Sequence, residues 1–130
     1  MTIKSHEDLL VWKFAMTLAT EVDALASGFP ANERYGLAAQ VRRSASSIPA
    51  NIAEGWARPT RVYINHLSIA LGSEAEVKTH LLLAVKMKLI TQAQADPLLA
   101  SASQVGRMLR GQKKSLHALL RRTQPPIPDP

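Results

Sequence analysis

Apolar residues recur every three or four positions along most of this chain, the spacing that places side chains on one face of an α-helix. Four stretches follow this spacing, over residues 8–27, 32–55, 60–88 and about 91–121. No stretch alternates between apolar and polar residues as a half-buried strand does. Because short loops join the long stretches, neighbouring helices should be antiparallel. The pattern predicts an all-α fold, an antiparallel up-down-up-down four-helix bundle over residues 1–122.

A proline lies inside the second stretch without disturbing its spacing. Pro49 has no amide hydrogen to donate, and its ring crowds the preceding turn, which bends or breaks a helix. The apolar positions keep the same phase through Pro49 as far as Gly55, so we expect one continuous helix with a kink at Pro49. Asn51 and Glu54 belong to the same stretch and are candidates to cap or brace the kink.

Small polar residues and prolines mark the expected helix ends. Ser5 or Asp8, Asn32 and Thr60 can accept hydrogen bonds from exposed backbone amides, so they are the expected caps of the first, second and third helices. Four prolines among residues 123–130 exclude a helix there and predict a disordered, proline-rich tail.

The third stretch carries more apolar surface than one buried face requires. Its residues 81–85 (Leu-Leu-Leu-Ala-Val) are apolar on more than one side of a helix, and Glu74 takes a position where the spacing leads us to expect an apolar residue. A second apolar face favours burial against another subunit. We therefore expect the protein to self-associate.

The composition restricts the compartment and the class of partner. A net charge of +6 and a pI near 10.1 favour polyanionic partners, such as nucleic acid or an acidic protein surface. The absence of cysteine excludes disulfides, thiolate nucleophiles and thiolate metal sites. Glu7 and Asp8 stand where a signal peptide has its apolar core, and no run of about 18 uncharged apolar residues exists. We expect a soluble, cytoplasmic protein that does not contact the membrane.

Positive charge is concentrated on the fourth stretch. Residues 1–31 hold two lysines against four acids, whereas residues 91–130 hold six Lys and Arg against two acids. At about 100° per residue, five basic side chains of this stretch share one helical face. They are Arg107, Arg110, Lys114, His117 and Arg121.

Two interpretations of this basic face stay open, a solvated surface and a nucleic-acid-binding surface. No acid stands between Asp96 and Asp129, whereas a solubilising surface usually mixes both signs of charge. The chain has only six aromatic residues, and none lies among these cations. Binding would therefore rest on phosphate contacts, would be weakly sequence-specific and would fall steeply with salt.

Arg42 and Arg43 form the other notable basic pair. Adjacent residues on a helix point about 100° apart. One arginine is therefore free to face solvent while the other reaches Glu54, Glu74 or Glu76 across a helix pair. An arginine–glutamate link that fixes the helix register is at least as plausible here as a phosphate contact.

No catalytic or metal-binding arrangement is found in the sequence. The four histidines, His6, His66, His80 and His117, lack the Glu-x-x-His spacing of the di-metal sites in some helix bundles. Glu76 and His80 are four residues apart, which favours a surface hydrogen bond over a metal site. No glycine-rich phosphate loop or nucleophile elbow exists either. We expect a non-enzymatic protein without cofactor or metal, and an enzyme only if several chains assemble a site.

The second stretch resembles the signature of a known family. Residues 35–37, 40–45 and 47–55 read Tyr-Gly-Leu, Gln-Val-Arg-Arg-Ser-Ala and Ser-Ile-Pro-Ala-Asn-Ile-Ala-Glu-Gly. They resemble the four-helix-bundle proteins encoded in intervening sequences of bacterial large-subunit ribosomal RNA. Flanking matches are Leu9, Val11, Trp12, Phe29, Pro30, Ala70, Gly72, Ser73, Glu76, Thr79, Leu81 and Leu82. The resemblance covers about residues 6–90.

Three positions depart from the family pattern. Ala57 stands where a second glycine is common, Pro59 stiffens the following loop, and Glu74 replaces a usual apolar residue. The contacts of the third helix should therefore differ locally. Within the motif and its match on the third helix, we assign a structural role to Ser47, Pro49, Asn51, Glu54, Gly55 and Glu76.

The resemblance also implies partners. The family is similar to the accessory variability determinant proteins of diversity-generating retroelements, which associate with a reverse transcriptase and bind nucleic acid. Its members assemble as rings of five bundles with basic surfaces, so a homopentamer is implied here.

Together, the residues and the resemblance predict an oligomeric, non-enzymatic bundle that binds RNA or DNA with weak specificity, associates with a reverse transcriptase, or does both. The alternative is a protein-interaction scaffold without a nucleic-acid role. The candidate nucleic-acid contacts are Arg42, Arg43, Arg58, Arg61, Arg107, Arg110, Lys114 and Arg121.

Overall fold

Four helices account for most of residues 2–123, the part of the chain that the computed structural model describes. They are α1 (Leu10–Ala26), α2 (Leu37–Trp56), α3 (Thr60–Lys86) and α4 (Gln92–Thr123). Two short 3₁₀ turns, His6–Asp8 and Ala31–Glu33, precede α1 and α2, and residues 2–123 contain no strand. The predicted all-α four-helix fold is confirmed.

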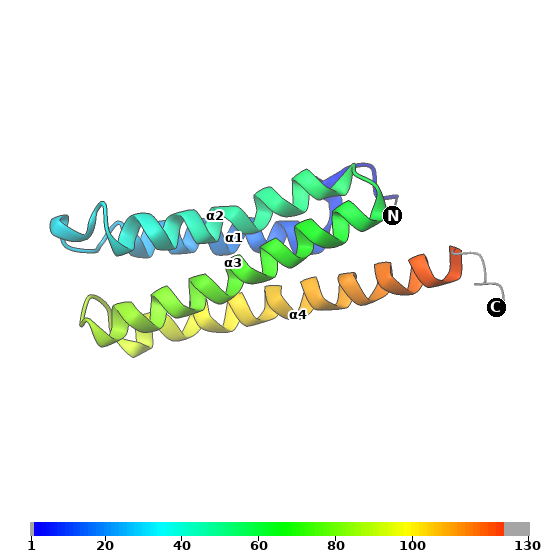
Figure 1. Cartoon of the computed structure of the whole chain (residues 1–130). Helices are drawn as coiled ribbons and strands as arrows, with labels where there is room; N and C mark the ends of the chain where they lie inside the picture. Colours follow the sequence, from blue (N-terminus) through cyan, green and yellow to red (C-terminus); the bar gives the residue numbers. More distant parts are fainter. Residues whose placement is uncertain (1, 124–130) are drawn as a thin grey trace.

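The helices pack as an antiparallel ring of neighbours. Each helix contacts the next along the chain, α4 closes the bundle against α1, and no Cα atoms of the diagonal pairs lie within 8 Å of each other. The start of α1, the connection from α2 to α3 and the end of α4 all lie at one end of the molecule (Figure 1). This is the predicted up-down-up-down order.

The core consists of aliphatic side chains that all four helices contribute. Leu18, Ile48, Leu67 and Leu109, one from each helix, are at most 1% exposed. All four belong to the apolar series with three- and four-residue spacing, so burial of one stripe per helix is the main stabilising term. Glu74 lies within this series on α3 and is buried too, at 3% exposure.

The first helix begins differently from the expectation. Ser5 caps the 3₁₀ turn before α1, where its hydroxyl accepts a hydrogen bond from the Glu7 amide at 3.2 Å. The Asp8 carboxylate accepts from the backbone amides of Lys4 and Ser5, and these bonds lower the pKa of Asp8. Leu9 occupies the cap position of α1 itself, without a side-chain bond.

The predicted caps of the second and third helices are wrong. Asn32 is taken up in the 3₁₀ turn, and α2 starts at Leu37, whose amide donates to the Glu33 carboxylate at 3.3 Å. Thr60 is the first residue of α3 rather than its cap, because the extended backbone of Pro59 takes the cap position. The 3₁₀ turn determines where α2 begins, and Pro59 determines where α3 begins. The spacing of apolar residues does not predict either feature.

The helix ends lie within two residues of their expected places. The third helix ends at Lys86 instead of about Lys88, and Lys88 itself has a left-handed backbone with φ of 62°. The fourth continues through Thr123, one residue past the expected boundary of the tail. The remainder of the expected tail, residues 124–130, lies outside the described residues.

The second helix runs through Pro49 as one element, as predicted, and Pro49 is buried. Asn51 Nδ2 donates to the Ser47 carbonyl oxygen at 2.9 Å and contacts the Ser47 hydroxyl at 3.0 Å. This contact spans the turn that contains the proline, in keeping with the bracing role expected of Asn51. The kink stays a prediction.

Gly55 lets α2 and α3 approach each other closely. A Cβ atom at this position would lie 2.8 Å from both His66 Cβ and Tyr63 Cδ1. Contacts that short are repulsive, and both neighbours are held on the first turns of α3. The structural role predicted for Gly55 is therefore to leave room for α3, because it has no side chain.

Substituting Gly55 tests this close approach. Gly55→Ala should lower the free energy of unfolding by about 1–3 kcal/mol, because the new methyl group forces the two helices apart. Gly72→Ala is the matched control, since Gly72 is exposed in the middle of α3 with no atom within 4 Å of an added Cβ. The control should instead stabilise by about 0.5–1 kcal/mol. Urea unfolding measures both; equal effects would contradict the packing argument.

Candidate nucleic-acid interface

The C-terminal part of α4 extends beyond the rest of the bundle. Gln112 Nε2 donates a hydrogen bond to the Tyr63 hydroxyl at 2.7 Å, so Gln112 is level with the first turn of α3. At 1.5 Å per residue, the helix continues for about 16 Å past this point. Figure 1 shows the end of α4 projecting past its neighbours.

The projection explains why two apolar positions of α4 are only partly buried. Leu116 is half-buried and Leu119 is 40% exposed, although both continue the apolar stripe of α4. The apolar stripe continues on the same face of α4, but beyond Gln112 few residues of the other helices lie opposite it. The exposed end of α4 therefore presents its polar side and part of its apolar side to solvent.

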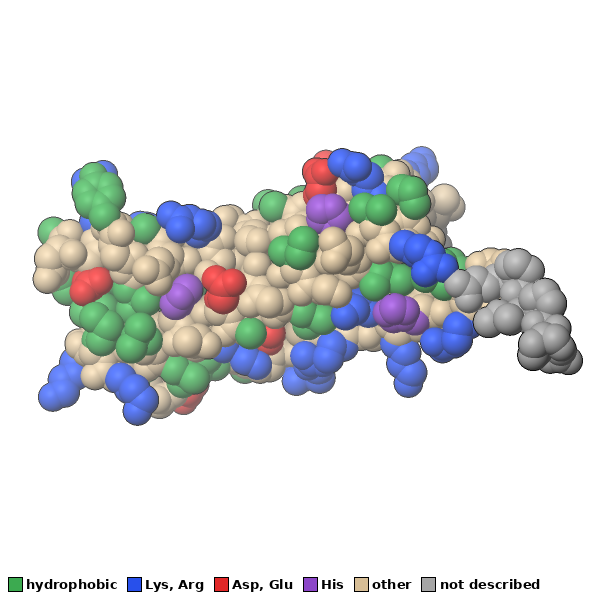
Figure 2. All heavy atoms as spheres, in the orientation of Figure 1, with side chains coloured by type: hydrophobic (Ala, Val, Ile, Leu, Met, Phe, Trp, Pro, Cys, Tyr) green, Lys and Arg blue, Asp and Glu red, His purple; other side chains and the backbone are tan. Residues whose placement is uncertain are grey.

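Basic side chains line a hollow of about 350 Å³ along this part of α4. They are Arg110, Lys113, Lys114, His117 and Arg121. Lys and Arg side chains gather over the same half of the helix in the space-filling view (Figure 2). Three predicted residues, Arg110, Lys114 and Arg121, are thus brought together. We call these five residues and Arg107 the basic face.

Two members of the basic face differ from the expectation. Lys113, which the sequence did not single out, lies on the side of the helix nearer the core and is half-buried, so its long side chain reaches the hollow from there. The sequence feature that could have identified Lys113 is its position three residues after Arg110, because residues three apart are neighbours on a helix surface. Arg107 donates to the Gln104 side chain at 2.7 Å and does not line the hollow.

The basic face is not neutralised by the protein's own acids. Within residues 2–123 three ion pairs form, and none involves a residue of α4. From Arg107 to Arg121 the face spans about 21 Å along the helix. The arrangement offers exposed cations to an external anion.

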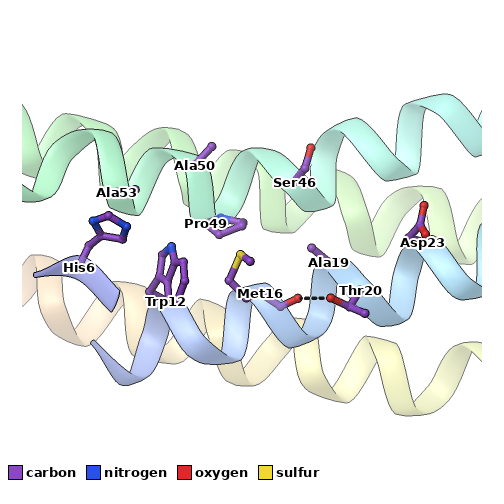
Figure 3. Close-up of a pocket in the computed structure, with 10 residues that line it drawn as sticks. All are labelled: His6, Trp12, Met16, Ala19, Thr20, Asp23, Ser46, Pro49, Ala50 and Ala53. Carbon is purple, nitrogen blue, oxygen red and sulfur yellow. Dashed lines mark hydrogen bonds between the residues drawn. The ribbon is translucent and has the colours of Figure 1, made fainter. Parts of the chain in front are cut away.

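A mainly apolar groove of about 550 Å³ lies between α1 and α2. Trp12 and Met16 rise from α1 toward Pro49 of α2 (Figure 3). The His6 and Trp12 rings meet edge to face, 5.3 Å apart. Trp12 is half-buried and packs against the core. The sequence missed the groove, since its walls come from three separate elements.

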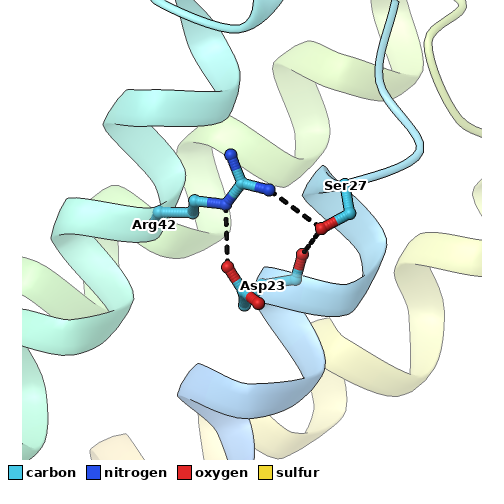
Figure 4. A network of polar contacts seen from close by, with 3 residues as sticks. All are labelled: Asp23, Ser27 and Arg42. Carbon is cyan, nitrogen blue, oxygen red and sulfur yellow. Dashed lines mark hydrogen bonds and ion pairs between the residues drawn. The ribbon is translucent and has the colours of Figure 1, made fainter.

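Arg42 is committed to a structural contact. Its Nε lies 2.8 Å from Asp23 Oδ1, and its Nη2 donates to the Ser27 hydroxyl at 2.9 Å (Figure 4). The expected glutamate partner is wrong, because Arg42 faces α1 rather than α3. Arg43 is exposed and forms no ion pair with any described residue, so the prediction that one of the two arginines faces solvent is confirmed.

Arg58 and Arg61 lie where α2 meets α3. Arg58 lies just past the end of α2 and pairs at 2.7 Å with Glu54, four residues earlier in the last turns of that helix. Arg61 is exposed at the start of α3. Both occupy the end of the bundle at which α4 projects, whereas Arg42 pairs with the far end of α1 (Figure 1).

The α2–α3 interface contains a line of polar contacts. The Ser44 hydroxyl lies 3.2 Å from Glu76 Oε2 and 3.4 Å from His80 Nδ1, so Glu76 and His80 meet at Ser44 instead of forming the expected direct hydrogen bond. Farther along, the Ser73 hydroxyl donates to the Ser47 hydroxyl at 2.8 Å. These contacts agree with a structural role for Ser47 and Glu76.

The second histidine of the interface meets the motif directly. His66 Nδ1 and Asn51 Oδ1 are 3.0 Å apart, across α3 and α2. Within residues 2–123 no group of three or more His, Asp or Glu side chains is placed to hold a metal ion. Nor does any helix of that part combine the length and apolar character needed to cross a membrane.

Comparisons with known proteins agree with the fold. The family described as 23S rRNA-intervening sequence protein matches residues 7–111. A similar structure is that of a protein with unknown function from the S23 ribosomal protein family of Bacteroides thetaiotaomicron, with a TM-score of 0.73 and 28% identity. That match covers 81% of this chain and 99% of the other. No curated protein matches the sequence significantly. A relationship to retroelement accessory proteins stays a prediction.

Tyr63 anchors the projecting helix, and its removal is testable. Tyr63→Phe loses the bond from Gln112 and should destabilise the protein by about 0.5–1.5 kcal/mol at pH 7. Burial raises the pKa of the Tyr63 hydroxyl. The stability that the neutral Tyr63 hydroxyl contributes through this pKa shift is therefore complete below a pH of about 10, the pKa of tyrosine in the unfolded chain. It is lost as pH rises through the folded-state pKa.

Urea unfolding between pH 7 and pH 11 measures both effects. The Phe variant should lose less stability than the parent across the alkaline range. Tyr35→Phe is the control, because Tyr35 is 86% exposed. Unchanged stability of Tyr63→Phe at pH 7 would contradict the anchoring role, and identical alkaline profiles would contradict the raised pKa of Tyr63.

Proposed function

We propose that this chain, which belongs to the 23S rRNA-intervening sequence protein family, binds the phosphate backbone of nucleic acid through the basic face of α4. The observation that supports the proposal is a set of cations on one exposed helical face that form no ion pair within residues 2–123. Duplex DNA carries one phosphate charge per about 1.7 Å, so a 21 Å face lies opposite about a dozen phosphates. The lysines and arginines of the face number five.

The composition of α4 favours backbone contacts over base reading. This helix contains no Phe, Trp or Tyr on which a base could stack. If all five cations contact phosphate, log K should fall with log salt at a slope of about −4.5. The affinity then drops about 500-fold between 50 and 200 mM salt. Such binding is weakly specific and needs several copies to be strong.

Charge reversal on the basic face tests the proposal. Arg107→Glu/Arg110→Glu/Lys114→Glu should weaken binding to RNA and DNA at least about tenfold at 50 mM salt. The slope of log K against log salt should become shallower, from about −4.5 to between about −2 and 0. Fluorescence anisotropy across a salt series measures both quantities.

A matched control carries the same change in net charge elsewhere. Lys13→Glu/Arg34→Glu/Lys86→Glu alters three exposed residues outside α4 and should retain most of the affinity. Equal loss in both variants would point to net charge instead of the basic face. No binding by the parent at low salt would contradict the proposal and favour the alternative, a protein-interaction scaffold.

We also propose self-association through the exposed apolar side of α3. Val62, Ile69, Leu83 and Met87 are 39–45% exposed and fall within about 60° of one another around the helix. Hydrophobic side chains gather where α3 ends in the space-filling view (Figure 2). Five subunits and a reverse-transcriptase partner stay predictions from the resemblance.

Light scattering at micromolar concentration tests the self-association. The parent should have a mass several times that of one chain, and Ile69→Glu/Leu83→Glu should be a monomer, because two charges would be buried at the interface. The control Leu10→Glu/Tyr35→Glu adds the same charges on α1 and before α2, at residues that are 60% and 86% exposed. A monomeric parent, or dissociation by the control alone, would refute the assigned surface.

A further inference from the structure

Glu74 is a buried carboxylate with an incomplete set of partners. It is 3% exposed, and its Oε1 atom lies 3.2 Å from Lys78 Nζ on the next turn of α3. Among the described residues, Oε1 has no hydrogen-bond partner. Burying a charge is costly unless it is paired and hydrogen-bonded. A single half-exposed lysine does not meet that requirement, so the position calls for a further explanation.

The neighbouring helix is shaped to fit this carboxylate. Gly106 of α4 lies directly over it, since a Cβ atom at Gly106 would stand 2.7 Å from Glu74 Oε1. The same Cβ would be 3.4 Å from Arg110 Nη1. Both charged atoms are thus close to one point, and at most about 6 Å separates them. Arg110 belongs to the basic face.

We propose that Glu74 is an internal counter-charge to the basic face. It attracts the Arg110 guanidinium toward the α3–α4 interface and so reduces the attraction of that arginine for an external phosphate. Glu74 is a positioning residue in this arrangement, since it acts on the ligand through Arg110. The effect on affinity rests on the proposed nucleic-acid function, whereas the coupling between Glu74 and Arg110 does not.

The burial of Glu74 gives this attraction its strength. A carboxylate at the protein surface is screened by water and salt, but one at 3% exposure acts through a medium of lower effective dielectric constant. A phosphate that approaches Arg110 must compete with it. Neutralising Glu74 should therefore increase the affinity of the face for nucleic acid and leave its location unchanged.

A double-mutant cycle in protein stability tests the coupling without any nucleic acid. The four proteins are the parent, Glu74→Gln, Arg110→Gln and the double variant, in which glutamine preserves size and polarity. The unfolding equilibrium constants, measured in urea at low salt, should show a coupling of at least about threefold. The coupling should shrink at 1 M salt, where the Debye length is about 3 Å. Effects that are additive within about twofold would overturn the proposal.

Nucleic-acid binding by the same four proteins tests the consequence. Glu74→Gln should bind about three- to tenfold more tightly than the parent at low salt, with a slope more negative by up to about 0.9. In the Arg110→Gln background the same change should have less than a twofold effect. Glu76→Gln, an exposed carboxylate on the other side of α3, controls for net charge.

The outcomes separate the two proposals. If the parent binds but Glu74→Gln behaves like Glu76→Gln, the counter-charge role is wrong while the proposed function stands. If the parent does not bind at low salt, the proposed function fails, and the stability cycle still decides whether Glu74 and Arg110 are coupled. Tighter binding by Glu74→Gln that persists without Arg110 would show that the carboxylate acts on the face as a whole, which overturns the assignment to Arg110.

Discussion

The close contact between α2 and α3 at Gly55 determines how far the basic face of α4 extends past the bundle. Because Gly55 has no side chain, Tyr63 and His66 lie directly against α2. Tyr63 then accepts the hydrogen bond from Gln112 that fixes α4 along the bundle. The cations of α4 past this anchor form no ion pair among the described residues, whereas Arg110 lies before the anchor and close to Glu74. A contact between two other helices therefore sets how much of the basic face projects beyond the bundle.

The acids of the protein pair with two of its other arginines. Asp23 holds Arg42 and Glu54 holds Arg58, so two of the four candidate arginines near the motif are engaged in structural contacts. Positive charge is concentrated on α4, because the sequence has no acidic residue between Asp96 and Asp129. Glu74 is different from the other acids, because it lies beneath the surface that its charge opposes.

Helical spacing was enough to predict the helices and their buried faces, including the place of Glu74 in the core series. It did not predict the caps, since the 3₁₀ turn at Ala31–Glu33 and the backbone of Pro59 compete with Asn32 and Thr60. The partner of Arg42 depends on which helix crosses α2 at that level, and spacing along one helix does not contain that information. The role of Lys113 was missed for a related reason, because its long side chain reaches a surface that its Cα position does not indicate.

The two proposed surfaces use the exposed sides of different helices. The cations of α4 lie about 140° around the helix from its buried stripe, and the exposed apolar residues of α3 lie about 130° from the buried stripe of that helix. Assembly through α3 therefore need not cover the basic face of any copy. A weak phosphate-binding surface gains most from such an arrangement, since each added subunit binds the same strand at high effective concentration. Oligomerisation would thus raise affinity while leaving the low sequence specificity unchanged, because repetition of phosphate contacts adds no reading of bases.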